Sequence, residues 1–519
     1  MTAYEDRLTS EQLGMMKDEI ESFLDSFATH QGEPLQRSLI FFPGGMGSEL
    51  VRSNIVFNPG LPGGSYGYQT LWVDLMRVIL EEAALLLQMN GNQDSSNRFI
   101  LANGALKNCA LHPYDNVATW CTANHLDLLM VGWDFRRNAD WNVNFFLQVL
   151  VPEVRRRANQ RGLGDPLKGA TMVGHSFGGM VVKWILNKYD DPFCQNLRLA
   201  ITVATPFYGS TGQTQRLFTS EPMLGPFYDA DDVTKTIATL PGGYSLFFLD
   251  SQTYDDYTAK LSGDPDFPLD RYPSFDKDDH SIRVDPYKFQ ASNPQNPHLC
   301  RYPLKGPNPA NNWTWFEGYL NGGAKDYARA ASPLDASMRS KLHNIRGVQT
   351  SGGADAAATK VMQSWGWYDL TKNRMPQAAD VITTFGGPGD GVIPAWSARL
   401  VTQDPANIHT IRGDMNGPVV LEHMTMMDHP AVRSTLLGLI KPGPAQSFVQ
   451  IATPTPASKE ELETVRQHIE QLAATRAMLP AKAAVKQYID GLSPEQQRAL
   501  ALRWFIELPK GAPPSAPLR

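Results

Sequence analysis

Cysteine is scarce in this chain, with 4 residues among 519. Cys109, Cys121, Cys194 and Cys300 lie far apart and form neither a C-x-x-C motif nor the spacing of a zinc site. Sparse cysteines are typical of proteins that keep their thiols reduced. The composition therefore favours a cytoplasmic location over a secreted fold held together by disulfides.

Long apolar runs and a basic surface are lacking as well. No stretch is long enough to span a bilayer, and the polar, acidic segment 1–7 is unlike a secretory signal peptide, so we expect no export signal and no stable membrane insertion. The net charge of −6 at pH 7 gives no electrostatic footprint for nucleic acid and no basic face for a membrane. We therefore expect no nucleic-acid partner.

The most informative segment is 170–180, where an apolar run leads into a G-x-S-x-G sequence and a helical pattern follows. This order is typical of a nucleophile elbow, in which the serine occupies a sharp, strained turn between a strand and a helix. Gly174 and Gly178 flank Ser176 and avoid the clashes that a Cβ would cause there. We predict that Ser176 is a nucleophile; the alternative is a glycine turn that carries a surface serine.

A triad in this setting takes its other members downstream, in the order Ser, Asp or Glu, His. Asp390 lies in a glycine-rich loop after an expected buried strand at 380–385, which is the place of a triad acid. Since Asp-Gly is a common turn signal, a plain turn residue is the alternative. His423, after a last short strand, is the predicted base. His429 is its rival, but it precedes a proline, which favours an extended conformation and a structural role.

An oxyanion hole is expected beside the nucleophile. It should combine the N–H of Phe177 with one from the glycine-rich loop after an early strand at 38–42, on Gly45 or Met46. His175 lies inside the elbow with its side chain diverging from the serine, so we expect it to pack at the wall of the site. Phosphate-loop and dinucleotide-binding patterns are absent from the sequence. Catalysis by a serine triad with an oxyanion hole requires no metal and no organic cofactor, so we expect neither.

Strands and helices alternate from about 36 to 205 and predict an α/β fold with a mostly parallel central sheet. The expected strands are 39–42, 126–133, 170–173 and 199–203, and the core resumes near Ile345. Ahead of them, an amphipathic helix is predicted to begin with a capping box at Thr9 and Gln12. The expected organisation is an N-terminal helix that packs on the core within 1–35, a core formed by 36–210 and 341–450, an inserted cap at 211–340, and a C-terminal helical arm at 457–510.

The predicted cap is rich in Pro, Asp, Tyr and Trp, as expected of a cover over an apolar site. Candidates to contact a substrate are His175, Trp133, Trp313, Trp315, Phe316 and Tyr319, although cap aromatics can equally form the cap's own core. In the arm, Leu500, Trp504 and Leu508 share one helix face that needs a partner surface. That surface is either the core or a second copy, so a homo-oligomer through the C-terminal helices is a hypothesis.

Several separated motifs resemble those of one known family. In chain order they are P-G-G-M-G-S-E-L at 43–50, W-D-F-R at 133–136, the elbow, T-P-F-Y-G-S at 205–210, L-P-G-G-Y-S at 240–245, G-D-G-V-I-P at 389–394, and Glu422 with His423. Together they resemble the lecithin:cholesterol acyltransferase-like and lysosomal phospholipase-like branch of the α/β-hydrolase superfamily. The resemblance implies an α/β-hydrolase fold with Ser176, Asp390 and His423 as its triad. Secreted members of that family have signal peptides and disulfides, which this sequence does not show.

These features predict a serine hydrolase that cleaves a carboxylic ester of a bulky hydrophobic small molecule. A macrocyclic lactone, such as one of the zearalenone type, would fit a covered apolar site and is a small, diffusible molecule. A lipid acyltransferase or phospholipase with the same triad is one alternative. A non-catalytic protein of the same fold that binds a hydrophobic ligand is another.

Overall fold

The computed structural model describes residues 3–30, 37–45, 47–54, 67–72, 89–90, 93–94, 99–105, 114–211, 239–247, 249–261, 266, 272–276, 283, 322, 326, 329–350, 361–367, 381–414 and 421–441. Met46, the four cap aromatics and the predicted arm at 457–510 lie outside these residues. Among the described residues, no helix combines the length and the apolar character needed to cross a membrane.

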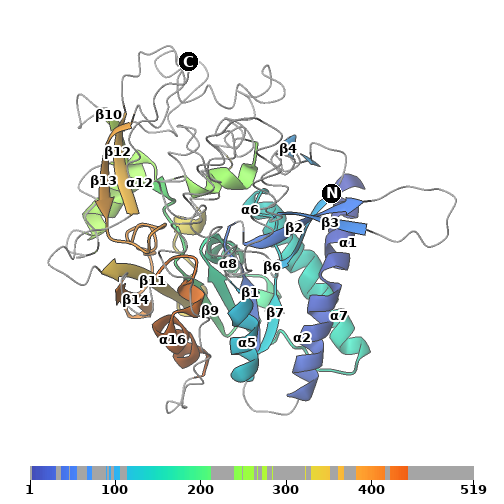
Figure 1. Ribbon diagram of the computed structural model, residues 1–519. Helices are drawn as coiled ribbons and strands as arrows, with labels where there is room; N and C mark the ends of the chain where they lie inside the picture. The colour runs from blue at the N-terminus through green and yellow to red at the C-terminus, as the bar shows by residue number, and fades with distance from the viewer. Residues whose placement is uncertain are drawn as a thin grey trace, which may run out of the picture.

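A central sheet of six strands has the order β14-β11-β9-β8-β1-β7, and every neighbouring pair is parallel (Figure 1). The strands are β1 (Ser38–Phe42), β7 (Asp127–Met130), β8 (Thr171–His175), β9 (Leu199–Val203), β11 (Leu342–Thr350) and β14 (Ile408–Asp414). Every residue of β1, β8 and β9 is buried. A parallel sheet covered on both faces has this property, which explains why the strands read as continuous apolar runs in the sequence.

Helices cover both faces of this sheet. The main ones are α2 (Lys17–Thr29), α5 (Asp115–Ala123), α6 (Ala139–Phe145), α7 (Val151–Gln160), α8 (Phe177–Leu186) and α16 (Pro430–Ile440). Ile40 and Met172 belong to one apolar cluster with α2, α6, α7 and α8, whereas Leu39 and Val173 belong to a second cluster with α5 and α16. Successive strand residues point to opposite faces, so each strand contributes to both clusters. The α/β fold with a mostly parallel sheet is thus as predicted.

The remaining helices are short or lie at the edges. They are α1 (Ala3–Met15), α9 (Pro192–Asn196), α12 (Ser251–Leu261), α15 (Ala336–Arg339), the π-helical segment η1 (Phe146–Leu150) between α6 and α7, and the 3₁₀ turns η2 (Pro241–Leu246), η5 (Pro405–Asn407) and η6 (Met426–Asp428).

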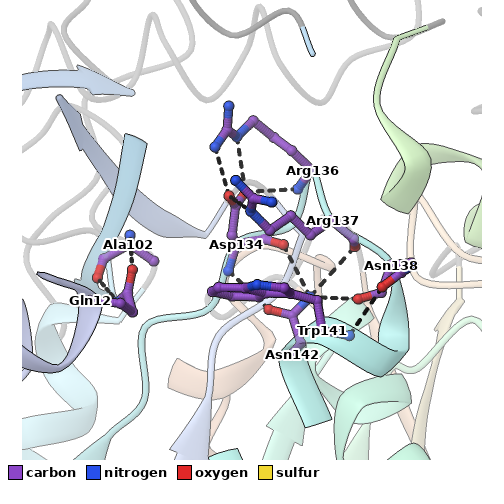
Figure 2. A network of polar contacts seen from close by, with 8 residues as sticks. All are labelled: Gln12, Ala102, Asp134, Arg136, Arg137, Asn138, Trp141 and Asn142. Carbon is purple, nitrogen blue, oxygen red and sulfur yellow. Dashed lines mark hydrogen bonds and ion pairs between the residues drawn. The ribbon is translucent and has the colours of Figure 1, made fainter. Parts of the chain in front are cut away.

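The N-terminal segment differs from the prediction, because it forms two helices, α1 and α2, and no capping box. Thr9 lies inside α1, where its hydroxyl donates to the carbonyl of Glu5 at 2.6 Å. Gln12 faces the neighbouring strand β6 (Ile100–Ala105): its amide nitrogen donates to the carbonyl of Ala102 and its amide oxygen accepts the Ala102 N–H (Figure 2). The two polar residues of the predicted capping box therefore have other roles. Thr9 bonds within α1, and Gln12 joins α1 to β6.

Within the described residues, three smaller sheets lie outside the central one. They comprise β3-β2-β6 with β2 (Ser48–Asn54) and β3 (Gly67–Trp72), the pair β4 (Met89–Asn90) and β5 (Gln93–Asp94), and β10-β12-β13 with β10 (Ser274–Asp276), β12 (Val361–Trp367) and β13 (Val381–Gly387). The strand expected at 380–385 is β13, and it pairs antiparallel with β12, away from the central sheet (Figure 1). The strand expected at 126–133 is shorter, since β7 ends at Met130.

Candidate active site

Ser176 occupies the sharp turn between β8 and α8. Its φ of +53° and ψ of −128° lie in a region that residues with a side chain seldom adopt. A Cβ on Gly174 would lie 2.5 Å from the carbonyl oxygen of Gly178, and one on Gly178 would lie 2.3 Å from the carbonyl oxygen of Phe42. The backbone elements pack so closely here that only glycine leaves enough room on either side of the serine.

The three side chains predicted as a triad lie in hydrogen-bond contact. His423 Nε2 is 2.8 Å from Ser176 Oγ, and His423 Nδ1 is 2.7 Å from Asp390 Oδ2. A carboxylate can only accept from the ring, so Nδ1 carries the proton and Nε2 is left to accept the serine hydroxyl hydrogen. This tautomer is the one in which a histidine can act as general base toward Ser176.

Asp390 is itself held in place by backbone donors. Its Oδ1 accepts the N–H of Val392 at 3.0 Å and that of Ile393 at 2.7 Å, and the residue is only 1% exposed. These bonds leave Oδ2 directed at the imidazole. The turn that suggested an ordinary Asp-Gly loop thus also orients the carboxylate.

Gln349, at the end of β11, joins the loop that carries Asp390 (the acid loop) to the segment that carries His423, and no motif marks it in the sequence. Its side-chain nitrogen donates to the carbonyls of Asp390 at 3.2 Å and Leu421 at 2.8 Å, while its own N–H donates to the carbonyl of Gly389 at 2.8 Å. The N–H of His423 also donates to the carbonyl of Asp390 at 2.9 Å. The acid loop is therefore attached to the central sheet through β11, although β13, the strand just before it, is not part of that sheet. The only signal in the sequence was the position of Gln349 near the carboxyl end of a core strand.

His175 lies behind the site and is fully buried. Its Nε2 is 2.9 Å from the carbonyl oxygen of His423 and its Nδ1 is 2.8 Å from the hydroxyl of Tyr114. Burial, together with the neighbouring His423, lowers the pKa of His175 well below its ordinary value, so the ring is neutral. The expectation that His175 packs at the wall agrees with this position. With zero exposure, it does not present a surface to a substrate.

The expected oxyanion donors lie next to one another. Phe177 is the first residue of α8, and the first N–H groups of a helix have no acceptor within the helix and lie at its positive end. Gly45 packs against Phe177, since an added Cβ would lie 3.0 Å from Cδ1 of that ring. Gly44 is close to the nucleophile, because a Cβ there would lie 3.0 Å from Ser176 Cβ.

Trp133, a candidate to contact substrate, is buried and supports the loop after β1 that is predicted to supply an oxyanion donor, called here the oxyanion loop (43–47). Its indole N–H donates to the carbonyl of Pro43 at 2.7 Å, and its ring meets that of Phe177 edge-on with centroids 4.9 Å apart. Its backbone N–H also donates to the hydroxyl of Ser48, at 3.2 Å. The indole of Trp133 thus contacts other residues of the protein, Pro43 and Phe177, and holds the wall of the site in place.

The acidic residue of the W-D-F-R motif holds two buried cations (Figure 2). Asp134 accepts from Arg136 Nη2 at 2.6 Å and Nε at 2.9 Å, and from Arg137 Nε at 3.0 Å. Burial alone would raise the pKa of Asp134, but the two guanidinium groups lower it below its ordinary value. Asn142 closes the network by donating to the carbonyl of Asp134 at 3.1 Å. The motif therefore fixes the turn after β7 and brings no further reactive group to Ser176.

Within the described part of the chain, no group of three or more His, Cys, Asp or Glu side chains is arranged to hold a metal ion. Cys121 and Cys194 are free and buried there, and burial raises the pKa of the Cys194 thiol to about 12. Both are too protonated to act as nucleophiles. Ser176 is the nucleophile candidate that the geometry favours.

No protein-family model matches this sequence, and a search of curated proteins found no match either. Among solved structures, a Tle4–Tli4 complex chain matches with 13% identity and a TM-score of 0.43, over 79% of this chain and 98% of that chain. The lin2722 product of Listeria innocua matches with 11% identity and a TM-score of 0.26, over 79% and 96%. Lipase 1 from Pelosinus fermentans matches with 10% identity and a TM-score of 0.28, over 78% and 98%.

The acyltransferase-like and lysosomal phospholipase-like branch is named in none of these three matches, so that assignment stays a prediction. The fold assignment rests on the structure of this chain. A parallel six-stranded sheet with helices on both faces, and a strained serine turn between β8 and α8, are the features of an α/β-hydrolase fold.

Proposed function

We propose that this protein is a serine hydrolase of carboxylic esters in which Ser176, His423 and Asp390 form the catalytic triad. The observation that carries the proposal is the pair of contacts at His423, 2.8 Å from Nε2 to Ser176 Oγ and 2.7 Å from Nδ1 to Asp390 Oδ2. Nucleophile, base and orienting carboxylate are thereby arranged for proton transfer and attack.

The proposed reaction has two halves. His423 Nε2 takes the proton of Ser176 as Oγ attacks the ester carbonyl, and the N–H of Phe177 with that of Gly45 or Met46 stabilises the oxyanion. Collapse of the intermediate releases the alcohol, which takes the proton from Nε2, and leaves an acyl group on Oγ. His423 then deprotonates a water that attacks the acyl-enzyme. The acid leaves, and the proton returns to Ser176. Asp390 stabilises the imidazolium in both halves.

The proposed substrate is a bulky hydrophobic ester or a macrocyclic lactone, such as one of the zearalenone type. Support comes from where the described parts of the predicted cap lie. The N–H of Gly242 donates to the carbonyl of Arg136 at 2.9 Å, and the N–H of Ser210 donates to that of Leu246 at 2.9 Å. Tyr257 of α12 donates to the carbonyl of Trp396, beyond the acid loop. These segments cover loops at the carboxyl ends of core strands, where ligands of such folds bind.

The proposal is tested by the hydrolysis of p-nitrophenyl esters of short and long acids, a phospholipid and zearalenone. Ser176→Ala should lower kcat by roughly a millionfold, because no other group replaces the attacking oxygen. Ser340→Ala, which removes an exposed hydroxyl after α15, is the matched control and should retain full activity. Turnover that survives in Ser176→Ala would place the nucleophile elsewhere.

The same assay separates the alternatives. A lipid acyltransferase would form the same acyl-enzyme and pass the acyl group to an added alcohol, so an ester product would outweigh the free acid. A phospholipase would prefer the phospholipid in the panel. A non-catalytic binding protein would bind a hydrophobic ester and release no product in either variant.

A further inference from the structure

A chain of hydrogen bonds runs behind the proposed triad, from the oxyanion loop to the base. The N–H of Gly44 lies 2.7 Å from the hydroxyl oxygen of Tyr114. That hydroxyl lies 2.8 Å from His175 Nδ1, and His175 Nε2 lies 2.9 Å from the carbonyl oxygen of His423. All four residues are buried. The chain thus joins four segments that are far apart in the sequence.

The two ends of the chain determine the position of every proton. The carbonyl of His423 can only accept, so His175 Nε2 must donate to it and Nδ1 must be the acceptor. The hydroxyl of Tyr114 therefore donates to Nδ1, and its oxygen accepts the N–H of Gly44. Every polar group in the chain is satisfied in this one arrangement, which holds only while His175 is neutral.

We propose that Tyr114 and His175 are a positioning pair that keeps the oxyanion loop at Gly44 in register with the base His423. The proposal rests on the proposed ester hydrolase function. Gly44 is next to Ser176. The ring of His175 bonds the carbonyl of His423 on one side and the hydroxyl of Tyr114 on the other, and that hydroxyl bonds Gly44. A shift of either loop would stretch a bond in the chain, so the pair couples the two halves of the site.

The close approach of the two imidazoles supports this role. The rings of His175 and His423 have centroids 4.9 Å apart and an interplanar angle of 38°. His423 becomes positively charged during the proposed reaction, and a charged neighbour at this distance would oppose that step. Burial and His423 keep the pKa of His175 well below its ordinary value, which leaves a neutral ring beside the developing charge.

A purely space-filling role for the tyrosine is the competing explanation. The ring of Tyr114 packs edge-on against Phe41 and His175, with centroids 5.2 and 5.7 Å apart. Tyr114→Phe preserves both ring contacts and removes only the hydroxyl. It therefore separates packing from positioning.

For Tyr114→Phe we expect kcat on a p-nitrophenyl ester to fall roughly tenfold while KM changes less than about twofold, because the lost bonds orient reacting groups and do not hold the substrate. Phosphorylation of Ser176 by diethyl p-nitrophenyl phosphate should slow by a similar factor. The matched control is Tyr272→Phe, which removes another buried hydroxyl bonded to a backbone carbonyl, that of Leu249 at 2.9 Å. It should leave both rates unchanged. An unchanged kcat in Tyr114→Phe, with normal activity in the wild type, would overturn the positioning pair alone.

Two substitutions of the histidine test the two ends separately. His175→Gln keeps an amide N–H near the place of Nε2, and His175→Asn keeps an acceptor near the place of Nδ1. In the His175→Gln background, adding Tyr114→Phe should lower kcat by a smaller factor than it does in the wild type, because the bond between the two side chains is already lost. Fully multiplicative effects would show that the two side chains act independently and would contradict the proposal.

The proton positions can be measured without an assay of activity. In a spectrum of the wild type with ¹⁵N-labelled histidine, His175 should be neutral with its proton on Nε2, and Tyr114→Phe should shift the Nδ1 resonance. A proton on Nδ1 of His175 would overturn the chain of donors directly. A wild type with no ester turnover and no phosphorylation of Ser176 would overturn the proposed function, and the positioning pair with it.

Discussion

At the scale of single residues, the site depends on backbone segments that approach one another without side chains between them. A Cβ on Gly178 would lie 2.3 Å from the carbonyl oxygens of both Phe42 and Pro43. These are backbone atoms of β1 and of the loop that leaves it, so they cannot move aside as a flexible side chain can. The glycine after Phe177 thus sets how closely α8 can approach the oxyanion loop.

We predict that Gly178→Ala destabilises the fold by several kcal/mol, because the overlap forces α8 away from β1. The free energy of unfolding in urea is the measurement. Gly438→Ala is the matched control, since it also lies in a helix, α16, and an added Cβ there would meet nothing within 4 Å. That variant should gain about 0.5 to 1 kcal/mol from helix propensity. Equal stability of the two variants would mean that the close approach at Gly178 is unimportant.

At the scale of elements, α8 contains an unusual buried cation. Lys183 is fully buried, and its Nζ donates to Asn187 Oδ1 at 2.8 Å and to the carbonyl of Arg329 at 3.1 Å. Burial lowers the pKa of Lys183 to about 7. In the unfolded chain the amine titrates near its ordinary value of 10.5, so between pH 7 and 10.5 the unfolded state binds more protons. The free energy of unfolding therefore rises with pH over that interval. Below pH 7, burial of the charged amine destabilises the fold to its full extent.

Lys183→Met should remove this cost while it keeps most of the side-chain volume. We expect a gain on the order of 2 kcal/mol at pH 6, after allowance for the two lost hydrogen bonds, and little or no gain at pH 10. Unfolding in urea at the two pH values measures the difference. A gain of the same size at both would mean that apolar packing, and not the proton, is responsible.

Several elements could be predicted because their signal is local. Strands β1, β8 and β9 read as apolar runs since both of their faces are buried, and Ser176 was predicted from the glycines that its turn requires. The partner of a strand is not a local property. The segment 380–385 is a strand as expected, yet its pairing with β12 could not be read from its own residues.

The residues around the proposed triad show the same limit. Tyr114 and Gln349 are single polar residues at the ends of elements, without a motif around them. Their importance comes from bonds to residues far away in the sequence, such as His175 and Asp390. Thr9 and Gln12 illustrate the reverse case, because a local capping pattern was overridden by contacts inside α1 and with β6.

At the scale of the whole molecule, an ion cluster of buried Asp266 and Arg346 with exposed Arg412 joins the predicted cap to the central sheet. Asp266 lies within the range 211–340 that is predicted to form the cap, and it is buried beside β11 and β14. Its carboxylate accepts from Arg346 at 2.9 Å and from Arg412 at 2.8 Å. Arg346 is itself buried and also donates to the hydroxyl of Thr410 at 2.8 Å. The segment at Asp266 is therefore tied to the central sheet by the carboxylate that compensates the buried guanidinium charge of Arg346.

Asp266→Asn keeps the shape of this side chain and removes its charge. We expect it to lower the free energy of unfolding by about 3 kcal/mol, because the buried charge of Arg346 loses its carboxylate partner. The control is Asp255→Asn, which breaks an exposed pair with Arg283, formed at 2.7 Å, and should have little effect since water screens that pair. Thermal unfolding measures both, and limited proteolysis should cut Asp266→Asn faster within 211–340 if the cap is released first. Equal melting temperatures in the two variants would show that the cluster does not hold the cap, and the attachment would then rest on the backbone contacts of η2 and on the bond from Tyr257 to Trp396.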